Sequence, residues 1–239
     1  FNAIGVIAAL PFLRPFARMM ERLIPSEAPT YTTALDPGLL RDESVARTAA
    51  LESTRLEFES LLRHVNAVLG DERTGQRANL AELQTALDET HHYVDRIAEP
   101  TPGAEASRER LVAAIHALDH LQRMHERCEE DEDRGITARQ TPPLADACRR
   151  LVDSNRAVRD AMARNAWREA ARTARATQDA IHEQVRPYRA EVVEQIAAGA
   201  EDVPTGTASL EAIRWLRRVS KHVARVTGYL AQAIAAAGR

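Results

Sequence analysis

Apolar residues recur along most of the chain at steps of three and four positions, the spacing typical of amphipathic helices with one face in a core. Six stretches follow this pattern, and we expect a helix in each: residues 43–69, 76–98, 104–133, 144–164, 166–199 and 208–237. In the first stretch the apolar face includes Val45, Leu51, Phe58, Leu61, Leu62, Val65 and Leu69. Glycine and proline, which commonly end helices, cluster between the stretches. The pattern therefore predicts an all-α protein.

The clearest interruption of this pattern, GITARQTPP at residues 135–143, predicts a linker. It separates three expected helices in residues 43–134 from three more in residues 144–239. Short connections between consecutive helices favour antiparallel neighbours. We therefore expect two antiparallel three-helix bundles side by side, preceded by an extended linker at residues 25–42 that is rich in proline and small polar residues.

Two of the expected helices resemble each other in sequence. The stretch AIHALDHLQRMHERCEE at 114–130 aligns with SLEAIRWLRRVSKHVAR, which begins at residue 209, 95 positions later. Apolar positions coincide at this offset; Leu121, for example, falls on Leu216. Such a repeat indicates two copies of one helical unit packed together. The polar faces differ: Asp119, Gln122 and Glu126 in the first copy correspond to Arg214, Arg217 and Lys221 in the second.

The segments HLQRMHER and WLRRVSKH resemble the signature of the PhoU family, a D-L-E-R-I-G-D-H-like helix found once in each of two three-helix repeats. In that family the acidic positions of the signature bind metal. The corresponding positions here are His120, Gln122 and Glu126 in the first copy, and Trp215, Arg217 and Lys221 in the second. The resemblance implies a PhoU-like pair of bundles in which most metal ligands have been replaced.

The N-terminal residues 1–24 have a different character. FNAIGVIAALPFL is uncharged and apolar, but a membrane-spanning helix needs about 20 such residues. Three arginines follow among apolar residues: Arg14, Arg18 and Arg22. This pattern is typical of the cytoplasmic end of a transmembrane helix that continues into an interfacial segment, and equally of an amphipathic helix packed on the domain.

A second resemblance bears on this choice. FNAIGVIAALPFLRPFARMMERLIP, followed by ALDPGLLRDESVARTAALESTR, resembles the junction of bacterial type II sodium/phosphate cotransporters. There the last membrane helix leads through a short linker with Leu-Asp-Pro into a PhoU-like domain. The resemblance implies that residues 1–24 end a transmembrane helix in the inner membrane. It also implies that the helical domain regulates or scaffolds the transporter's membrane domain from the cytoplasm.

The transport core that would handle sodium and phosphate is absent from this sequence, so we expect no cofactor in it. Its start at Phe1, without a methionine, suggests a fragment or a processed chain. The alternative function is a stand-alone PhoU-like adaptor of phosphate signalling that binds a partner protein. A homodimer is compatible with both.

Charge and chemistry narrow these options. The formal net charge of −3 argues against a nucleic-acid partner. The sequence lacks a G-x-S-x-G motif, a phosphate-cradling glycine loop and a Ser/His/Asp order, so we do not expect an enzyme. Cys128 and Cys148 show no C-x-x-C spacing, which favours buried, reduced thiols.

Three residues are candidate metal ligands. His116 and His120 share one helix face at a spacing of four, and Glu126 is close by in sequence. Imidazoles at this spacing can share a zinc ion if a third ligand converges; otherwise they are solvated surface histidines. In the second unit, Arg217 and Lys221 would repel any cation, so we expect no metal there.

The second signature helix also carries a basic face. Its members, spaced so that they share one side of the helix, are Arg214, Arg217, Arg218, Lys221 and Arg225, hereafter the basic stripe. Three interpretations are open: a solvated face, ion pairs with the acidic residues at 126–133, or a docking surface for phosphate or acidic lipid headgroups.

Overall fold

The computed structural model describes residues 31–98, 104–129 and 132–235 of the 239-residue chain. The segment 1–24, with its expected membrane or interfacial helix, lies outside the described residues. The helices are η1 (Pro37–Arg41), α2 (Glu43–Val68), α3 (Leu80–Val94), α4 (Glu105–Glu129), α5 (Glu132–Gln140), η2 (Pro142–Leu144), α6 (Ala145–Ala163), α7 (Trp167–Ala197) and α8 (Val203–Ala235). The described part contains no strand, which confirms the all-α prediction.

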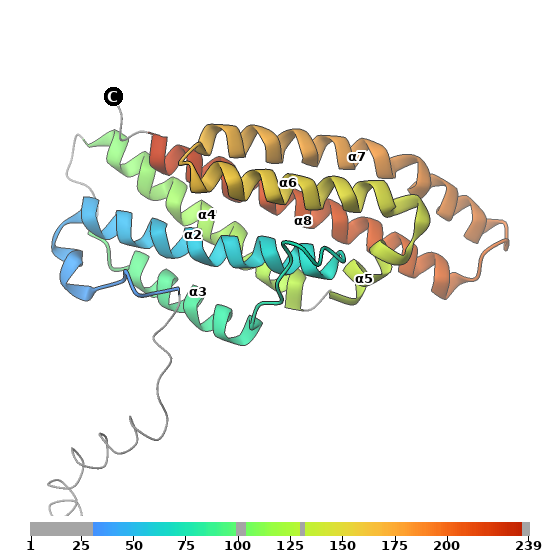
Figure 1. Ribbon diagram of the computed structural model, residues 1–239, viewed down its shortest axis with the longest axis horizontal. Coiled ribbons are helices and arrows are strands. Elements are labelled where there is room, and N and C mark those ends of the chain that lie inside the picture. The colour runs from blue at the N-terminus through green and yellow to red at the C-terminus, as the bar shows by residue number, and fades with distance from the viewer. Residues whose placement is uncertain (1–30, 99–103, 130–131, 236–239) are drawn as a thin grey trace, which may run out of the picture.

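Two groups of three helices pack against each other. Helices α2, α3 and α4 contact one another, and α6, α7 and α8 do the same. The groups are joined along α4 and α8, the two helices that carry the repeated signature. Figure 1 shows the result as an elongated bundle with α7 on its upper side and α3 on its lower side. The three-helix units therefore share a long interface.

One large apolar core runs through both groups of helices, beside a second, small cluster of Ala113, Ala114 and Ala233. Its largest fully buried side chains include Phe58 and Leu61 of α2, Leu121 of α4 and Trp215 of α8. Of the apolar residues predicted for the first helix, Phe58, Leu61, Leu62, Val65 and Leu69 are buried. The prediction is wrong for Val45, which is 44% exposed, because it lies on the outer face of α2, whereas the next residue, Ala46, faces the core and is fully buried.

The interface between α4 and α8 has an internal two-fold relation. The rings of His120 and His222 lie 5.5 Å apart, and Trp215 Nε1 donates a hydrogen bond of 3.0 Å to the carbonyl of Arg127. At the offset of the sequence repeat, His120 corresponds to Trp215 and Arg127 to His222. Each contact therefore joins the first of these two repeat positions on one helix to the second position on the other helix, so the two contacts are equivalent. Helices α4 and α8 are antiparallel and related by a pseudo-two-fold axis.

The axis passes through buried, equivalent positions. Midway between the two contacts lie Met124 and Val219, which the repeat aligns with each other and which are both fully buried. A like-with-like contact also joins the first helices of the two units, α2 and α6. There Asn155 Nδ2 donates a hydrogen bond of 2.9 Å to Asn66 Oδ1, and both asparagines are fully buried.

The segment 135–143, predicted to be a linker, is largely helical. Helix α5 extends to residue 140, and Pro142 begins the short helix η2. A Cβ added to Gly135 would lie 2.6 Å from Val68 Cγ1 and 2.9 Å from the Trp215 ring, so this glycine allows α5 to approach both helices closely. The prediction treated glycine and proline as helix breaks. Here the glycine serves packing, and the prolines stand at a helix start, where no backbone donor is needed.

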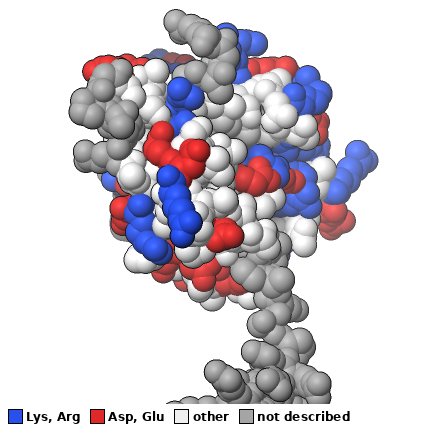
Figure 2. Space-filling view, turned by 90° about the vertical axis from the view of Figure 1, so that its left-hand side faces the viewer, with Lys and Arg blue, Asp and Glu red and all other residues white. Residues whose placement is uncertain are grey.

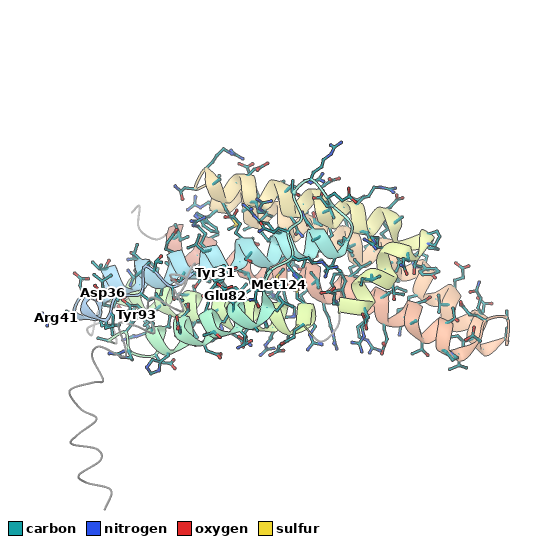
Figure 3. The ribbon with its side chains drawn as sticks, turned by 60° about the horizontal axis from the view of Figure 1, so that its bottom comes forward. Tyr31, Asp36, Arg41, Glu82, Tyr93 and Met124 are labelled. Atoms are coloured by element: carbon teal, nitrogen blue, oxygen red, sulfur yellow. The ribbon has the colours of Figure 1, made fainter. Side chains whose placement is uncertain are left out.

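The described part of the other predicted linker also packs on the bundle. In residues 31–42, the backbone carbonyl of Asp36 accepts a hydrogen bond of 3.1 Å from the hydroxyl of Tyr93 in α3, and Figure 3 shows these two residues together. The Thr32 hydroxyl donates to the Glu89 carboxylate at 2.7 Å. An extended, free linker is therefore the wrong description from residue 31 onward. The polar residues that suggested a linker make its hydrogen bonds to α3.

We expect Gly135→Ala to lower the free energy of unfolding by about 1–3 kcal/mol, because the added methyl group must displace Val68 or Trp215. The matched control is Gly228→Ala in α8, where a Cβ would meet no atom within 4 Å. That variant should gain up to about 1 kcal/mol from the higher helix propensity of alanine. Urea unfolding at pH 7 measures both. Equal effects at the two glycines would contradict the close packing of α5.

Candidate functional site

A cluster of aromatic and imidazole rings lies across the interface of α4 and α8. His116 and His120 of α4 both face Tyr229 of α8, with ring centroids 5.0 Å and 5.6 Å apart. The rings of His120 and Tyr229 are stacked, with an interplanar angle of 13°, and His120 also contacts His222. The structure thus brings two sequence-predicted metal candidates together with two residues of α8 that the sequence did not single out.

The ring cluster is not arranged around a metal ion. Within the described residues, no three His, Cys, Asp or Glu side chains converge as metal ligands. The third candidate, Glu126, lies 3.6 Å from the guanidinium of its neighbour Arg127. A metal role for His116, His120 and Glu126 accordingly stays a sequence prediction, and the cluster is better described as a set of ring contacts, of which the pair His120–Tyr229 is stacked.

Burial and positive neighbours lower the pKa of two histidines of this cluster, His120 and His222. The pKa of His222 is lowered to about 4, first by burial and then by His120, Lys221 and the arginines of α4. Burial also lowers the pKa of His120, with Arg225 and Lys221 acting in the same direction. The Nδ1 atoms of His120 and His222 are buried without a hydrogen-bond partner among the described residues. The positive charge around the cluster therefore comes from lysine and arginine.

The basic stripe points outward from α8. Arg214, Arg218, Lys221 and Arg225 are exposed, and Arg217 is half-buried. No carboxylate of the described residues pairs with any of the five, whereas the acidic groups near the end of α4 have other partners: Glu132, for example, pairs with Arg77. On the end of the bundle shown in Figure 2, positive and negative side chains alternate. The basic stripe differs from that end of the bundle because all of its charged side chains are positive.

The interpretation of the stripe as ion pairs with residues 126–133 has no support among the described residues. Glu129 lies 3.9 Å from His125, and Arg134 beyond the acidic run pairs with Glu211 at 3.1 Å. Neither carboxylate forms an ion pair with the stripe. Residues 130 and 131 lie outside the described part of the chain. The solvated face and the anion-docking surface stay open.

A groove of about 630 Å³ lies beside the stripe, between α7 and α8. Its charged lining consists of three arginines, Arg172, Arg175 and Arg225, and one carboxylate, Asp179. Asp179 Oδ2 accepts a hydrogen bond of 3.2 Å from Arg175 Nε. Arg172 and Arg225 have no ion pair with a carboxylate of the described residues. The groove therefore presents unpaired guanidinium groups, which bind carboxylate and phosphate oxygens well.

The groove and the ring cluster are one continuous site. Tyr229 lines the groove and also stacks on His120, and Arg225 belongs both to the groove and to the basic stripe. We refer to this combination as the α7–α8 groove. It can bind an anionic group, and its Tyr229 hydroxyl can donate a hydrogen bond to one. The lining holds neither a cysteine nor a serine that could act as a nucleophile.

The sequence analysis found Arg225 but missed the α7 side of the groove. The sequence did contain an indication of this basic face. Helical spacing places three arginines on one side of α7: Arg168, Arg172 and Arg175. The predicted basic stripe rested on the repeated signature alone, and α7 lies outside that repeat. Only the antiparallel packing of α7 on α8 shows that two basic faces meet at one groove.

Comparison with protein-family models, with curated proteins and with solved structures finds no match for this chain. The resemblances to the PhoU family and to the cotransporter junction therefore stay predictions. Among the described helices, none is both long enough and apolar enough to cross a membrane. Function must be argued from the geometry of the chain itself.

We expect the protein to lose about 1–3 kcal/mol of stability as the pH falls from 6.5 towards 4 because of His222. In the unfolded chain this imidazole takes up a proton near pH 6.5, whereas the folded pKa is about 4, so protonation favours unfolding across that window. The His222→Gln variant should lose less stability over this pH range than the parent protein does. The His182→Gln variant, changed at an exposed site of α7, should lose as much as the parent. Urea titrations at several pH values test this; identical slopes for the parent and His222→Gln would refute it.

Proposed function

We propose that the chain is the PhoU-like regulatory or scaffolding domain of a sodium-dependent phosphate transporter, acting on the transporter's membrane domain from the cytoplasmic side of the inner membrane. The supporting observation is the pseudo-two-fold relation between two three-helix units, with α4 and α8 packed on each other. The sequence resemblance implies this organisation: a duplicated unit with one signature helix in each copy. The resemblance of residues 1–57 to the transporter junction supplies the membrane context.

We assign this domain a binding role rather than a catalytic one. Its two cysteines, Cys128 and Cys148, are buried, and burial raises the pKa of each thiol to about 12. Such thiols are poor nucleophiles at neutral pH. The imidazoles of the ring cluster contact one another and Tyr229, and among the described residues no serine or threonine hydroxyl is bonded to them. These features suit a domain that recognises a ligand or partner.

A second candidate is a stand-alone PhoU-like adaptor of phosphate signalling that binds a partner protein. The observation in its favour is the outer surface of α4, where Val112 and Ile115 are each 44% exposed. Neighbouring exposed apolar side chains are a common feature of protein interfaces. The gene upstream of Phe1 separates the two candidates: further hydrophobic spans support the transporter, and a start codon just before Phe1 supports the adaptor.

If the transporter proposal is correct, deletion of residues 43–239 from the full-length protein should leave sodium-dependent phosphate uptake in place. The uptake rate should, however, no longer respond to the phosphate supply of the cell, because the regulatory domain is gone. Radiolabelled phosphate uptake into cells grown at low and high phosphate measures both effects, with transporter abundance in the membrane as the control. Unchanged regulation in the truncated protein would argue against the proposal.

A further inference from the structure

We propose that the α7–α8 groove binds a hydroxyl-bearing phosphate ester, held by Arg172, Arg175 and Arg225. The ester is either a soluble sugar or glycerol phosphate or the headgroup of a phospholipid such as phosphatidylglycerol. This assignment goes beyond the regulatory role proposed above and does not depend on it. It rests on charge, on shape and on polar groups that lack partners.

The charge of the groove favours a ligand with several negative oxygens. Arg172 and Arg175 approach from α7 and Arg225 from α8, and the single lining carboxylate, Asp179, already accepts a hydrogen bond from Arg175. Guanidinium groups brought together without carboxylates repel one another, and a bound anion removes that repulsion. Lys221 and the rest of the stripe continue the positive potential along α8, which steers anions towards the groove.

A glycine keeps the groove open. Gly228 lies in the interior of α8 and lines the groove, although glycine destabilises a helix by about 1 kcal/mol relative to alanine. No atom lies within 4 Å of the position that its Cβ would occupy, so close packing does not require a glycine here. The missing side chain instead leaves room, together with the small residues Ala171, Ala176 and Ala224. The volume of about 630 Å³ is large enough for a phosphate ester.

Polar groups without partners point to the rest of the ligand. The Tyr229 ring is fixed by its stacking on His120, and its hydroxyl has no hydrogen-bond partner among the described residues. This hydroxyl can donate to a phosphate oxygen. The side-chain oxygen of Gln178, another lining residue, is buried and also unpartnered within the described part of the chain. A buried acceptor of this kind is satisfied by a ligand hydroxyl; a polyol ester offers several, whereas dianionic inorganic phosphate offers only its single P–O–H.

The test uses the full chain and two probes: glycerol 3-phosphate in isothermal titration calorimetry, and flotation with phosphatidylglycerol vesicles against phosphatidylcholine vesicles. We expect Arg172→Gln and Arg225→Gln each to weaken binding about ten- to hundredfold, since each removes a charged hydrogen-bonding group. Gly228→Leu should abolish binding although it changes no charge. Arg189→Gln, which removes one exposed arginine of α7 outside the groove, should bind as the parent does. Circular dichroism confirms that each variant is folded.

The outcomes separate the sources and can overturn the proposal. Saturable binding of glycerol 3-phosphate supports a soluble ester, and binding of phosphatidylglycerol vesicles alone supports a lipid headgroup; each must be lost in Gly228→Leu. Binding that survives in Gly228→Leu, or that weakens equally in Arg189→Gln, would reflect general charge and would overturn the site. Citrate that binds as tightly as the phosphate ester would overturn the phosphate assignment, and so would the absence of binding to either probe. None of these results depends on whether the chain belongs to a transporter.

Discussion

The packing of α4 against α8 determines the rest of the molecule. Each of these helices is the third member of its own three-helix unit, and each also supplies the surface through which the units meet. Their contact is centred on Met124 and Val219, both fully buried, and it includes the indole of Trp215. Without the partner unit, these side chains would face water at a cost of about 2 kcal/mol each. The two units are therefore one cooperative core rather than two domains joined by a linker.

This interface also fixes which residues face outward. Once Leu216, Val219 and Val223 are turned into the core, the helical period places Lys221 and Arg225 on the outer surface of α8. The same constraint sets α7 beside α8, so that their two basic faces border one groove. The position of the candidate site thus follows from apolar packing, whereas its positive charge comes from exposed arginines on the outer faces of α7 and α8.

The features that the sequence predicted well depend on local periodicity. The extent of α2 and the burial of Phe58 and Leu61 both follow from apolar spacing within one helix. The features that it missed depend on contacts between distant segments. Only folding brings Gly135 into close contact with two other helices. The hydrogen bond between Tyr93 and the Asp36 carbonyl likewise joins residues that are 57 positions apart in the sequence. Arg172 becomes part of a site only because α7 is antiparallel to α8. No local pattern encodes these pairings.

The two signature helices have kept one face alike and changed the other. On α4, Arg123 lies 3.3 Å from the Asp119 carboxylate, so that surface carries a paired charge. The aligned positions on α8 are Arg214 and Arg218, so the same geometry there holds two positive groups. Apolar positions tolerate little change because both copies pack on one axis, whereas solvent-facing positions are free of that constraint. A difference in outer charge between two copies of one fold is therefore where a distinct binding property can arise, and it lies on α8, beside the groove.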